Sequence, residues 1–153
     1  NNDNCETLLY KITELASKNL IKTLEQYAMN MIKTIKQEDK EATYCFKIKK
    51  EDTYITFNQK AYEIYGKIRA FNPNPGAKCY IKGELVKIVE AEVVNENLVY
   101  KKYGMVLDNN LLISCRKGAI RLTKIQRQGR KPMISKVLLN GWKIEKGLIL
   151  NER

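Results

Sequence analysis

The run at residues 72–76, Asn-Pro-Asn-Pro-Gly, is the strongest local constraint on how this chain can fold. Proline fixes φ, lacks a backbone N–H group and disfavours helical geometry at the residue before it, so a helix that reaches this run must end there. Apolar residues before the run have helical spacing and define one inward face, made of Ala61, Ile64, Tyr65, Ile68 and Phe71. We therefore expect a short helix and then a rigid turn that leads the chain into a different structure.

Short β-prone segments separated by turn residues follow this run. They occupy residues 78–82, 85–94, 104–107, 111–115 and 119–126, with a helical turn at 135–140 and a closing strand at 147–150. Regularly spaced short strands predict an antiparallel barrel or sandwich. In the strand at 119–126 apolar residues alternate with basic and polar ones, so we expect one face to pack and the other to be basic.

Apolar residues also recur at helical spacing between residues 6 and 35, after the cap candidates Asn2, Asp3 and Asn4. This pattern predicts a long amphipathic helix. Its apolar stripe is interpreted as a packing face, because it carries no residue suited to chemistry.

The polar run at 37–41 lacks periodicity and predicts a linker, with a domain boundary near residue 40. Beyond it, residues 44–49 and 54–57 are β-prone and partly alternating. We expect two short strands here, joined by a turn at 50–52.

The net charge of +11 is concentrated in one part of the chain. Residues 1–65 carry ten basic and ten acidic side chains, whereas residues 66–153 carry eighteen basic and seven acidic ones. No carboxylate occurs between residues 109 and 144, a stretch with nine Lys or Arg residues. Such a stretch favours a polyanionic partner, above all a nucleic acid. The alternative is a surplus of basic residues that only keeps the surface soluble.

Several kinds of chemistry are excluded by composition. The chain has no histidine, which removes Ser-His-Asp triads, Cys-His pairs and histidine-ligated metals. Its four cysteines are more than thirty residues apart and form no C-x-x-C motif, so we expect free thiols. We assign no catalytic residue and no metal ligand. No apolar stretch is long enough to span a membrane, so we expect no membrane partner and a location in the cytoplasm or an organelle matrix.

Three segments together resemble the C-terminal region of methionyl-tRNA formyltransferases. Residues 68–77 (Ile-Arg-Ala-Phe-Asn-Pro-Asn-Pro-Gly-Ala) are similar to the signature that opens that domain. Residues 42–57 resemble the family's interdomain linker, and residues 118–133 resemble its Gly-x-Leu-x-Leu and Leu-Gln-x-x-Gly-Lys-Lys/Arg-x-Met run. Residues 7–24 look like the last long helix of the formyl-transferring domain. Asn74 stands where the family usually has Trp.

The resemblance implies a fold and assigns catalysis and tRNA binding to different domains. The fold is mainly β, a small antiparallel OB-like barrel with a short helix, preceded by a long N-terminal helix and a linker. Residues 1–40 would be the terminal helix of the catalytic domain plus linker, and residues 41–153 the C-terminal tRNA-binding domain. The parent enzyme transfers formyl from 10-formyltetrahydrofolate to the amino group of initiator methionyl-tRNA in translation initiation.

The partners and cofactors follow from the same resemblance. The family's folate site and its catalytic Asn, His and Asp lie upstream of the matched region, so we expect this piece to bind no cofactor and to be inactive alone. Its expected partners are initiator methionyl-tRNA and the missing N-terminal catalytic domain.

The predicted tRNA-binding residues are all cations that could neutralise phosphates. One group combines a strand face with the loop after it: Arg121, Lys124, Arg127, Arg130 and Lys131. A second group could extend this stripe through the first two strands: Lys78, Lys82 and Lys87. A third group is suggested by the family's linker lysines: Lys47, Lys49 and Lys50. For each group the alternative is a solvated surface. Four tyrosines could stack on bases or be half-buried barrel aromatics: Tyr44, Tyr54, Tyr80 and Tyr103.

Two other functions stay open at this point. The chain could be the C-terminal domain of another formyltetrahydrofolate-dependent enzyme, such as a nucleotide-sugar formyltransferase or formyltetrahydrofolate dehydrogenase. The strong positive charge favours the tRNA enzyme, because a sugar nucleotide needs no such field. It could instead be a free-standing basic barrel that binds RNA, anionic membranes or proteins. A membrane role would need an amphipathic basic helix, whereas the sequence of the basic run predicts strands.

Overall fold

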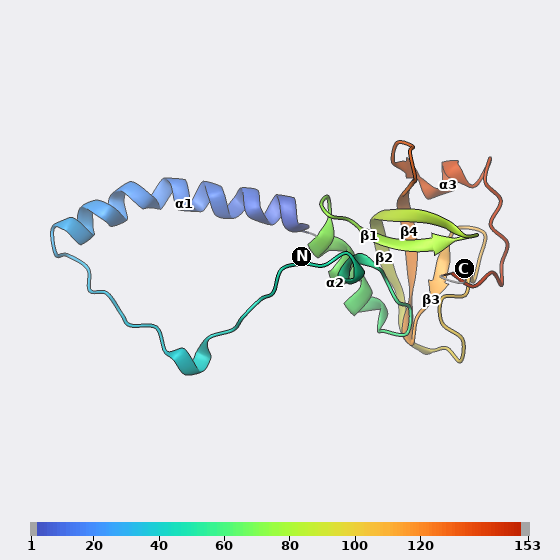
Figure 1. The fold of residues 1–153 in the computed structure, drawn as a ribbon, viewed down its shortest axis with the longest axis horizontal. Coiled ribbons are helices and arrows are strands. Elements are labelled where there is room, and N and C mark those ends of the chain that lie inside the picture. The colour runs from blue at the N-terminus through green and yellow to red at the C-terminus, as the bar shows by residue number, and fades with distance from the viewer. Residues whose placement is uncertain (1–2, 151–153) are drawn as a thin grey trace.

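The computed structural model describes residues 3–150, so the cap candidate Asn2 lies outside the described residues. Helix α1 (Cys5–Ala28) is followed by an extended segment and then by a folded unit. In chain order the unit contains α2 (Ala61–Phe71), β1 (Ala77–Ile81), β2 (Glu84–Val99), β3 (Leu112–Ser114), β4 (Lys117–Arg127), β5 (Met133–Ile134) and α3 (Ser135–Leu138). Figure 1 shows α1 running away from this unit and the chain then returning to it.

The strands form one antiparallel sheet in the order β1-β2-β4-β3, with β5 paired to β4. A mainly antiparallel fold with few helices is therefore confirmed. Within residues 3–150 the two outer strands, β1 and β3, do not pair with each other, so the sheet is open and a closed OB-like barrel is not confirmed.

Two segments predicted as strands, 104–107 and 147–150, contribute only single bridges. Met105 is bridged to Ile149, and Val106 to Ile113. Gly104 and Gly147, which begin these segments, have φ values of +78° and +94°. The left-handed backbone at both glycines interrupts an extended ladder, which explains why regular strands do not form there.

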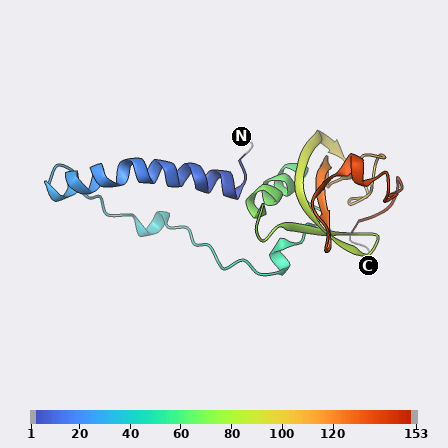
Figure 2. The ribbon, with the colours of Figure 1, turned by 90° about the horizontal axis from the view of Figure 1, so that it is seen from above.

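The core lies between α2 and the inner face of the sheet, as Figure 2 shows. Ile64 and Ile68 of α2 are fully buried, as the predicted inward face requires. They belong to one cluster with the buried side chains of Ile88, Ile120 and Ile125. In β1 buried and half-buried residues alternate, so the period-2 pattern fixes which face packs on α2.

The Asn-Pro-Asn-Pro-Gly run ends α2 and turns the chain into β1, as predicted. Asn72 donates its side-chain amide to the carbonyl of Val89 at 3.1 Å, and the N–H of Gly76 donates to Phe71 at 2.9 Å. Gly76 has a φ of +85°, and a Cβ atom there would collide with the side chain of Lys87. The left-handed backbone favours glycine at this position, whereas the Lys87 side chain is flexible and could move away from a Cβ atom.

Helix α1 is shorter than predicted. Asn4, one of the cap candidates, is its N-cap, and a capping box forms in which Asn4 and Thr7 exchange hydrogen bonds at 2.9 and 3.0 Å. The helix ends at Ala28 instead of Ile35, because Asn30 adopts a left-handed φ of 57° and the N–H of Met31 donates to Gln26. This is a Schellman motif with Asn in place of the usual Gly.

The apolar stripe of α1, interpreted from the sequence as a packing face, is uncovered in the described structure. None of its residues is buried, and Leu9 and Leu15 are each 62% exposed. The start of the helix touches the folded unit where Arg69 donates to the carbonyl of Asp3 at 2.9 Å. Most of α1 therefore projects into solvent.

The segment between α1 and α2 corrects two predictions. A 3₁₀ turn at Asp39–Glu41 lies in the predicted linker, but residues 44–49 form no strand. Phe46 is 90% exposed, and no strand of the described chain pairs with this segment. Of residues 54–57 only Tyr54 makes a bridge, to Lys78. β-prone residues without a partner strand gain no ladder hydrogen bonds, so the pattern alone did not produce a strand.

Glu84, Arg127 and Trp142 form a side-chain cluster at one end of the sheet, which we call the clamp. Arg127, at the end of β4, donates from Nε and Nη2 to the carboxylate of Glu84 at 2.9 and 2.6 Å. Its guanidinium carbon lies 4.3 Å from the ring centre of Trp142. The clamp joins the start of β2, the end of β4 and the C-terminal segment, so it holds together parts of the chain that are distant in sequence.

Replacing Glu84 with Gln removes the charged acceptor of this clamp. We expect the free energy of unfolding at neutral pH to fall by about 1–2 kcal/mol, because a charge-assisted bidentate pair is lost from a partly buried site. Chemical denaturation of the wild type and the variant measures this difference. Glu145→Gln, at an exposed residue, is the matched control and should change little.

The same variant has an expected pH dependence. The hydrogen bonds from Arg127 hold the pKa of Glu84 below its ordinary value. A depressed carboxyl pKa stabilises the fold above the unfolded-state pKa of about 4.3, and this stabilisation is lost as pH falls through the folded-state pKa. The gap between wild type and Glu84→Gln should therefore close in acid. A gap that stays constant down to about pH 3 would contradict the role given to the charge.

Deleting residues 3–38 should leave the folded unit intact, because α1 buries none of its side chains. We expect the unfolding free energy to change by less than about 0.5 kcal/mol. The full chain should also self-associate more at high concentration, since it exposes a contiguous apolar stripe. Denaturation and sedimentation of both chains test this. A large loss of stability on deletion would mean that α1 packs on the sheet in solution.

Candidate nucleic-acid interface

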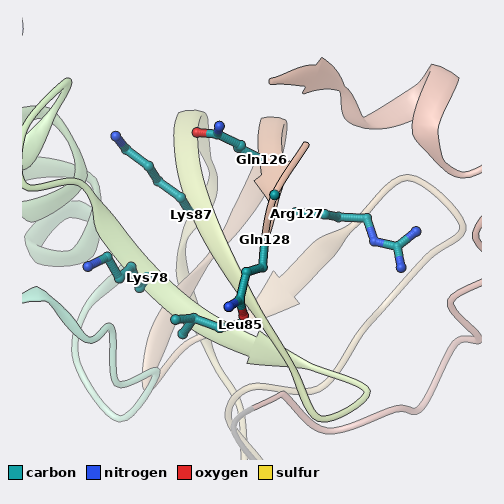
Figure 3. Close-up of a pocket in the computed structure, with 7 residues that line it drawn as sticks. Lys78, Leu85, Lys87, Gln126, Arg127 and Gln128 are labelled. Atoms are coloured by element: carbon teal, nitrogen blue, oxygen red, sulfur yellow. The ribbon is translucent and has the colours of Figure 1, made fainter. Parts of the chain in front are cut away.

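The pairing of three strands places one row of polar side chains across the sheet. Lys78 of β1 is opposite Lys87 of β2, and Lys87 is in turn opposite Gln126 of β4. These three residues, with Leu85, Arg127, Gln128 and Gly129, line a shallow pocket of about 170 Å³. Figure 3 shows Lys78, Lys87 and Gln126 projecting from neighbouring strands, whereas Arg127 points away from the two lysines.

Lys82 and Lys87 are both engaged with the backbone. The ammonium of Lys87 donates to the carbonyl of Pro73 at 2.6 Å, which ties β2 to the Asn-Pro-Asn-Pro-Gly turn. The ammonium of Lys82 lies 3.4 Å from the carbonyl of Lys143. Lys87 therefore has a role in the turn, although its positive charge stays at the rim of the pocket.

Three of the five cations predicted on β4 and its loop are ion-paired. Arg121 donates to Asp108 at 2.9 Å, and also to the carbonyl of Asn110. Lys124 contacts Glu90 at 3.1 Å. The third is Arg127, in the clamp with Glu84. Residues 109–144 contain no acid in sequence, but neighbouring segments bring acids to their cations in space.

The pKa of Asp108 reflects this pairing. Partial burial alone would raise the pKa, but the hydrogen bonds from Arg121 and from the N–H groups of Leu112 and Asn110 outweigh it. The result is a pKa below the ordinary value for Asp, so the Arg121 pair is charged at neutral pH. A phosphate approaching Arg121 would meet a guanidinium whose charge is already balanced.

Arg130, Lys131 and Lys78 make no ion pair within residues 3–150. Arg130 and Lys131 are exposed in the turn after β4. Gln126 donates to the carbonyl of Arg130 at 2.7 Å, which fixes this turn beside the pocket. We refer to Lys78, Arg130 and Lys131 as the β4-end cations.

The linker lysines lie apart from this group. Lys47, Lys49 and Lys50 are exposed in the extended segment before α2. Asp52 accepts a hydrogen bond from the backbone N–H of Lys49 at 2.8 Å, so its carboxylate shapes the 3₁₀ turn at Glu51–Thr53. The structure therefore brings Lys78 and Lys87 beside the end of β4, but the linker lysines do not line this pocket.

Two of the four tyrosines are packed against each other. Tyr54 and Tyr80 stack with ring centres 6.0 Å apart and an interplanar angle of 10°. Both are half-buried, and Tyr54 is bridged to Lys78 through the backbone. Tyr44 and Tyr103 are exposed. The half-buried alternative thus applies to the first pair only.

Four exposed cations outside the predicted site gather at the other end of β4. They are Lys101, Lys102, Arg116 and Lys117. A sequence signal for them exists, because Asp108 is the only acid between residues 97 and 144. Counting charge from residue 109 onward missed the first two.

The cysteines and the acids offer little to a ligand. Cys79 and Cys115 are buried free thiols, and burial raises the pKa of each to about 12. Within residues 3–150 no three Cys, Asp or Glu side chains converge as metal ligands. No helix of the described chain is long and apolar enough to cross a membrane.

Comparison with known proteins agrees with the resemblance drawn from the sequence. Residues 47–143 match the family described as formyl transferase, C-terminal domain. The chain is 38% identical to methionyl-tRNA formyltransferase of Pelagibacter ubique over 95% of its length and 46% of that protein. It is 36% identical to the enzyme so named from Caldicellulosiruptor saccharolyticus, over 98% of this chain and 49% of that one.

A solved structure shares the fold. All of this chain superposes on 30% of a variant of HypX from Aquifex aeolicus, with a TM-score of 0.61 and 19% identity. The chain spans about half the length of the curated relatives it matches. The family match extends from the linker, through the Asn-Pro-Asn-Pro-Gly turn and all five strands, to the clamp residue Trp142. The chain therefore belongs to the formyl transferase C-terminal domain family.

Proposed function

We propose that this chain is the C-terminal part of a methionyl-tRNA formyltransferase and that it holds the phosphate backbone of the tRNA. The main support is its similarity, along almost its entire length, to relatives that bear this name. The second support is a set of exposed or half-buried cations that make no ion pair in the described part of the chain. Phosphate contacts of this kind supply affinity and orientation, but little sequence information.

The ion pairs divide the predicted contacts into two classes. The β4-end cations and the linker lysines, Lys47, Lys49 and Lys50, are the tRNA contacts in this proposal. Arg121, Lys124 and Arg127 contribute less, because each must exchange an existing carboxylate partner for a phosphate. Such an exchange gains little net charge interaction.

The proposed division of the protein follows the resemblance. Residues 1–40 complete the catalytic domain and its linker, and residues 41–153 form the tRNA-binding domain. Formyl transfer from 10-formyltetrahydrofolate to the amino group of initiator methionyl-tRNA belongs to the part of the protein that this chain does not cover. The reaction would take place in the cytoplasm or an organelle matrix.

The chain alone should produce no formyl-methionyl-tRNA from methionyl-tRNA and 10-formyltetrahydrofolate. It has no histidine for proton transfer, and the family's folate site lies in the other half of the protein. A product assay with the full-length Pelagibacter ubique relative as positive control tests this. Product above the background of a mock preparation would show that the chain carries chemistry of its own.

The chain should bind tRNA in a strongly salt-dependent way through the β4-end cations. Replacing Lys78, Arg130 and Lys131 together with Gln should flatten the slope of log K against log salt by about two units, at ~0.7–0.9 per phosphate contact. Fluorescence titration with labelled tRNA at several salt concentrations measures the slope.

The matched control removes three exposed cations elsewhere, with Lys22→Gln, Lys33→Gln and Lys36→Gln. Both triple variants lower the net charge equally, so a general field effect would flatten both slopes alike. Equal slopes in the two variants would place the contact elsewhere on the molecule.

A further inference from the structure

Two chain segments bring four cations together at the end of the sheet opposite the clamp. The hydroxyl of Ser114 donates to the carbonyl of Lys102 at 2.8 Å, and the N–H of Gly104 donates to Ser114 at 2.8 Å. These bonds hold the loop after β2 against the end of β3. Val99 of β2 also pairs with Lys117 of β4. We call the resulting cluster of Lys101, Lys102, Arg116 and Lys117 the turn patch.

The turn patch has little acidic compensation. All four of its side chains are exposed, and no ion pair involves them in the part of the chain that the structure describes. Glu96 lines the same small hollow as Lys60 and Lys117 and is the neighbouring carboxylate. Lys60 itself is paired with Glu63 at 3.7 Å. The patch thus keeps an excess of positive charge, unlike Arg121, Lys124 and Arg127.

Rigid backbone supports the patch. Arg116 donates its N–H to the carbonyls of Phe57 and Gln59, at 3.1 and 3.0 Å. Gly118 is buried with a φ of +77°, and a Cβ there would lie 3.1 Å from that of Ala61. The turn is therefore packed against the start of α2, so the cations stand on an ordered surface.

Tyrosines flank the cations. Tyr100 is half-buried, and Tyr103 is 43% exposed. Cations next to accessible aromatic rings suit RNA, because phosphates bind the cations and an unpaired base can stack on a ring. This combination favours RNA over a lipid surface, which is usually bound by an amphipathic basic helix.

We propose that the turn patch is a second RNA-backbone contact, separate from the β4-end cations. This inference rests on the proposed function. The two sites lie at opposite ends of β4, which has 11 residues, and are therefore about 33 Å apart at ~3.3 Å per residue. Figure 1 shows the start of β4 at the lower end of the sheet, away from α3. Two contacts near opposite ends of one sheet engage a large folded RNA together and raise its affinity by linkage.

The test uses the full chain and a third triple variant, Lys101→Gln, Lys102→Gln and Lys117→Gln. It removes the same charge as the β4-end triple and the Lys22, Lys33 and Lys36 control. We expect the turn-patch triple to flatten the salt slope for tRNA by about two units, at ~0.7–0.9 per contact, while the control keeps the wild-type slope. Circular dichroism and thermal melting check that each variant is folded.

The possible failures are distinguishable. If the wild type binds tRNA and only the β4-end triple changes the slope, the turn patch is not a contact and the proposed function survives. If the wild type does not bind tRNA, both proposals are overturned. If the turn-patch triple loses binding to phosphatidylserine vesicles but keeps its tRNA slope, the patch serves a membrane and the RNA contact is wrong.

A measurement on the wild type avoids dependence on the variants. Lysine acetylation with and without tRNA, read by mass spectrometry, should show protection of Lys101, Lys102 and Lys117. Lys22 and Lys36 on the N-terminal segment should stay reactive. If saturating tRNA lowers the acetylation of Lys101, Lys102 and Lys117 no more than that of Lys22 and Lys36, the inference is overturned.

Discussion

The antiparallel pairing of β2 with β4 supports the rest of the structure. β2 is the longest strand and also pairs with β1, while β4 also pairs with β3 and β5. Irregularities in the register around Glu90 let the long β2 bend and twist. The inner faces of the two strands supply Ile88, Ile120 and Ile125 to the core against α2. Every other strand pairs with β2 or β4, so the positions of the cations on the sheet depend on this pair.

The same pairing decides which charges are available to a partner. Glu84 and Glu90 on β2 stand across from the end of β4 and neutralise Arg127 and Lys124. Cations beyond the paired region, at both ends of β4, meet no acid at ion-pair distance in the described chain. The fold therefore uses Arg121, Lys124 and Arg127 for its own stability, whereas the cations without an ion pair near both ends of β4 are the ones proposed to meet a ligand.

In the proposed function, this arrangement lets the domain contact RNA through separate groups of cations and not through a continuous basic stripe. An arginine held by a bidentate carboxylate gains little by exchanging it for a phosphate, because both acceptors are anionic. A free lysine at the surface releases counterions from the RNA when it binds. The two classes of cation differ in their surroundings and not in their residue type.

Local pattern was sufficient for much of the fold. Short β-prone segments between turns predicted β1, β2 and β4, with period-2 alternation seen in β4. Helical spacing with the Asn-Pro-Asn-Pro-Gly stop predicted α2 and its end. The strand predictions failed where strand formation depends on pairing with a segment distant in sequence. Residues 44–49 had the composition of a strand but no partner, and β5 forms only because β4 extends beside it. The end of α1 was missed because a left-handed Asn30, without glycine, is a weak signal in sequence.

The candidate site shows the same limit. The sequence shows where the cations lie along the chain, but it did not predict which of them form ion pairs. Asp108 lies one residue before the stretch without acids, and it still reaches Arg121 across a turn. Glu84 lies 43 residues before Arg127 and reaches it only through the sheet. A charge count along the chain cannot include such contacts.

One paired measurement tests the separation of structural from RNA-binding cations most directly: the unfolding free energy and the tRNA salt slope of Arg127→Gln and of Arg130→Gln. We expect Arg127→Gln to be measurably less stable than the wild type, because the bidentate pair with Glu84 is lost, while its slope stays close to that of the wild type. Arg130→Gln should keep its stability and flatten the slope by about one unit. A folded Arg127→Gln variant that flattens the slope as much as Arg130→Gln, with no loss of stability, would contradict the separation.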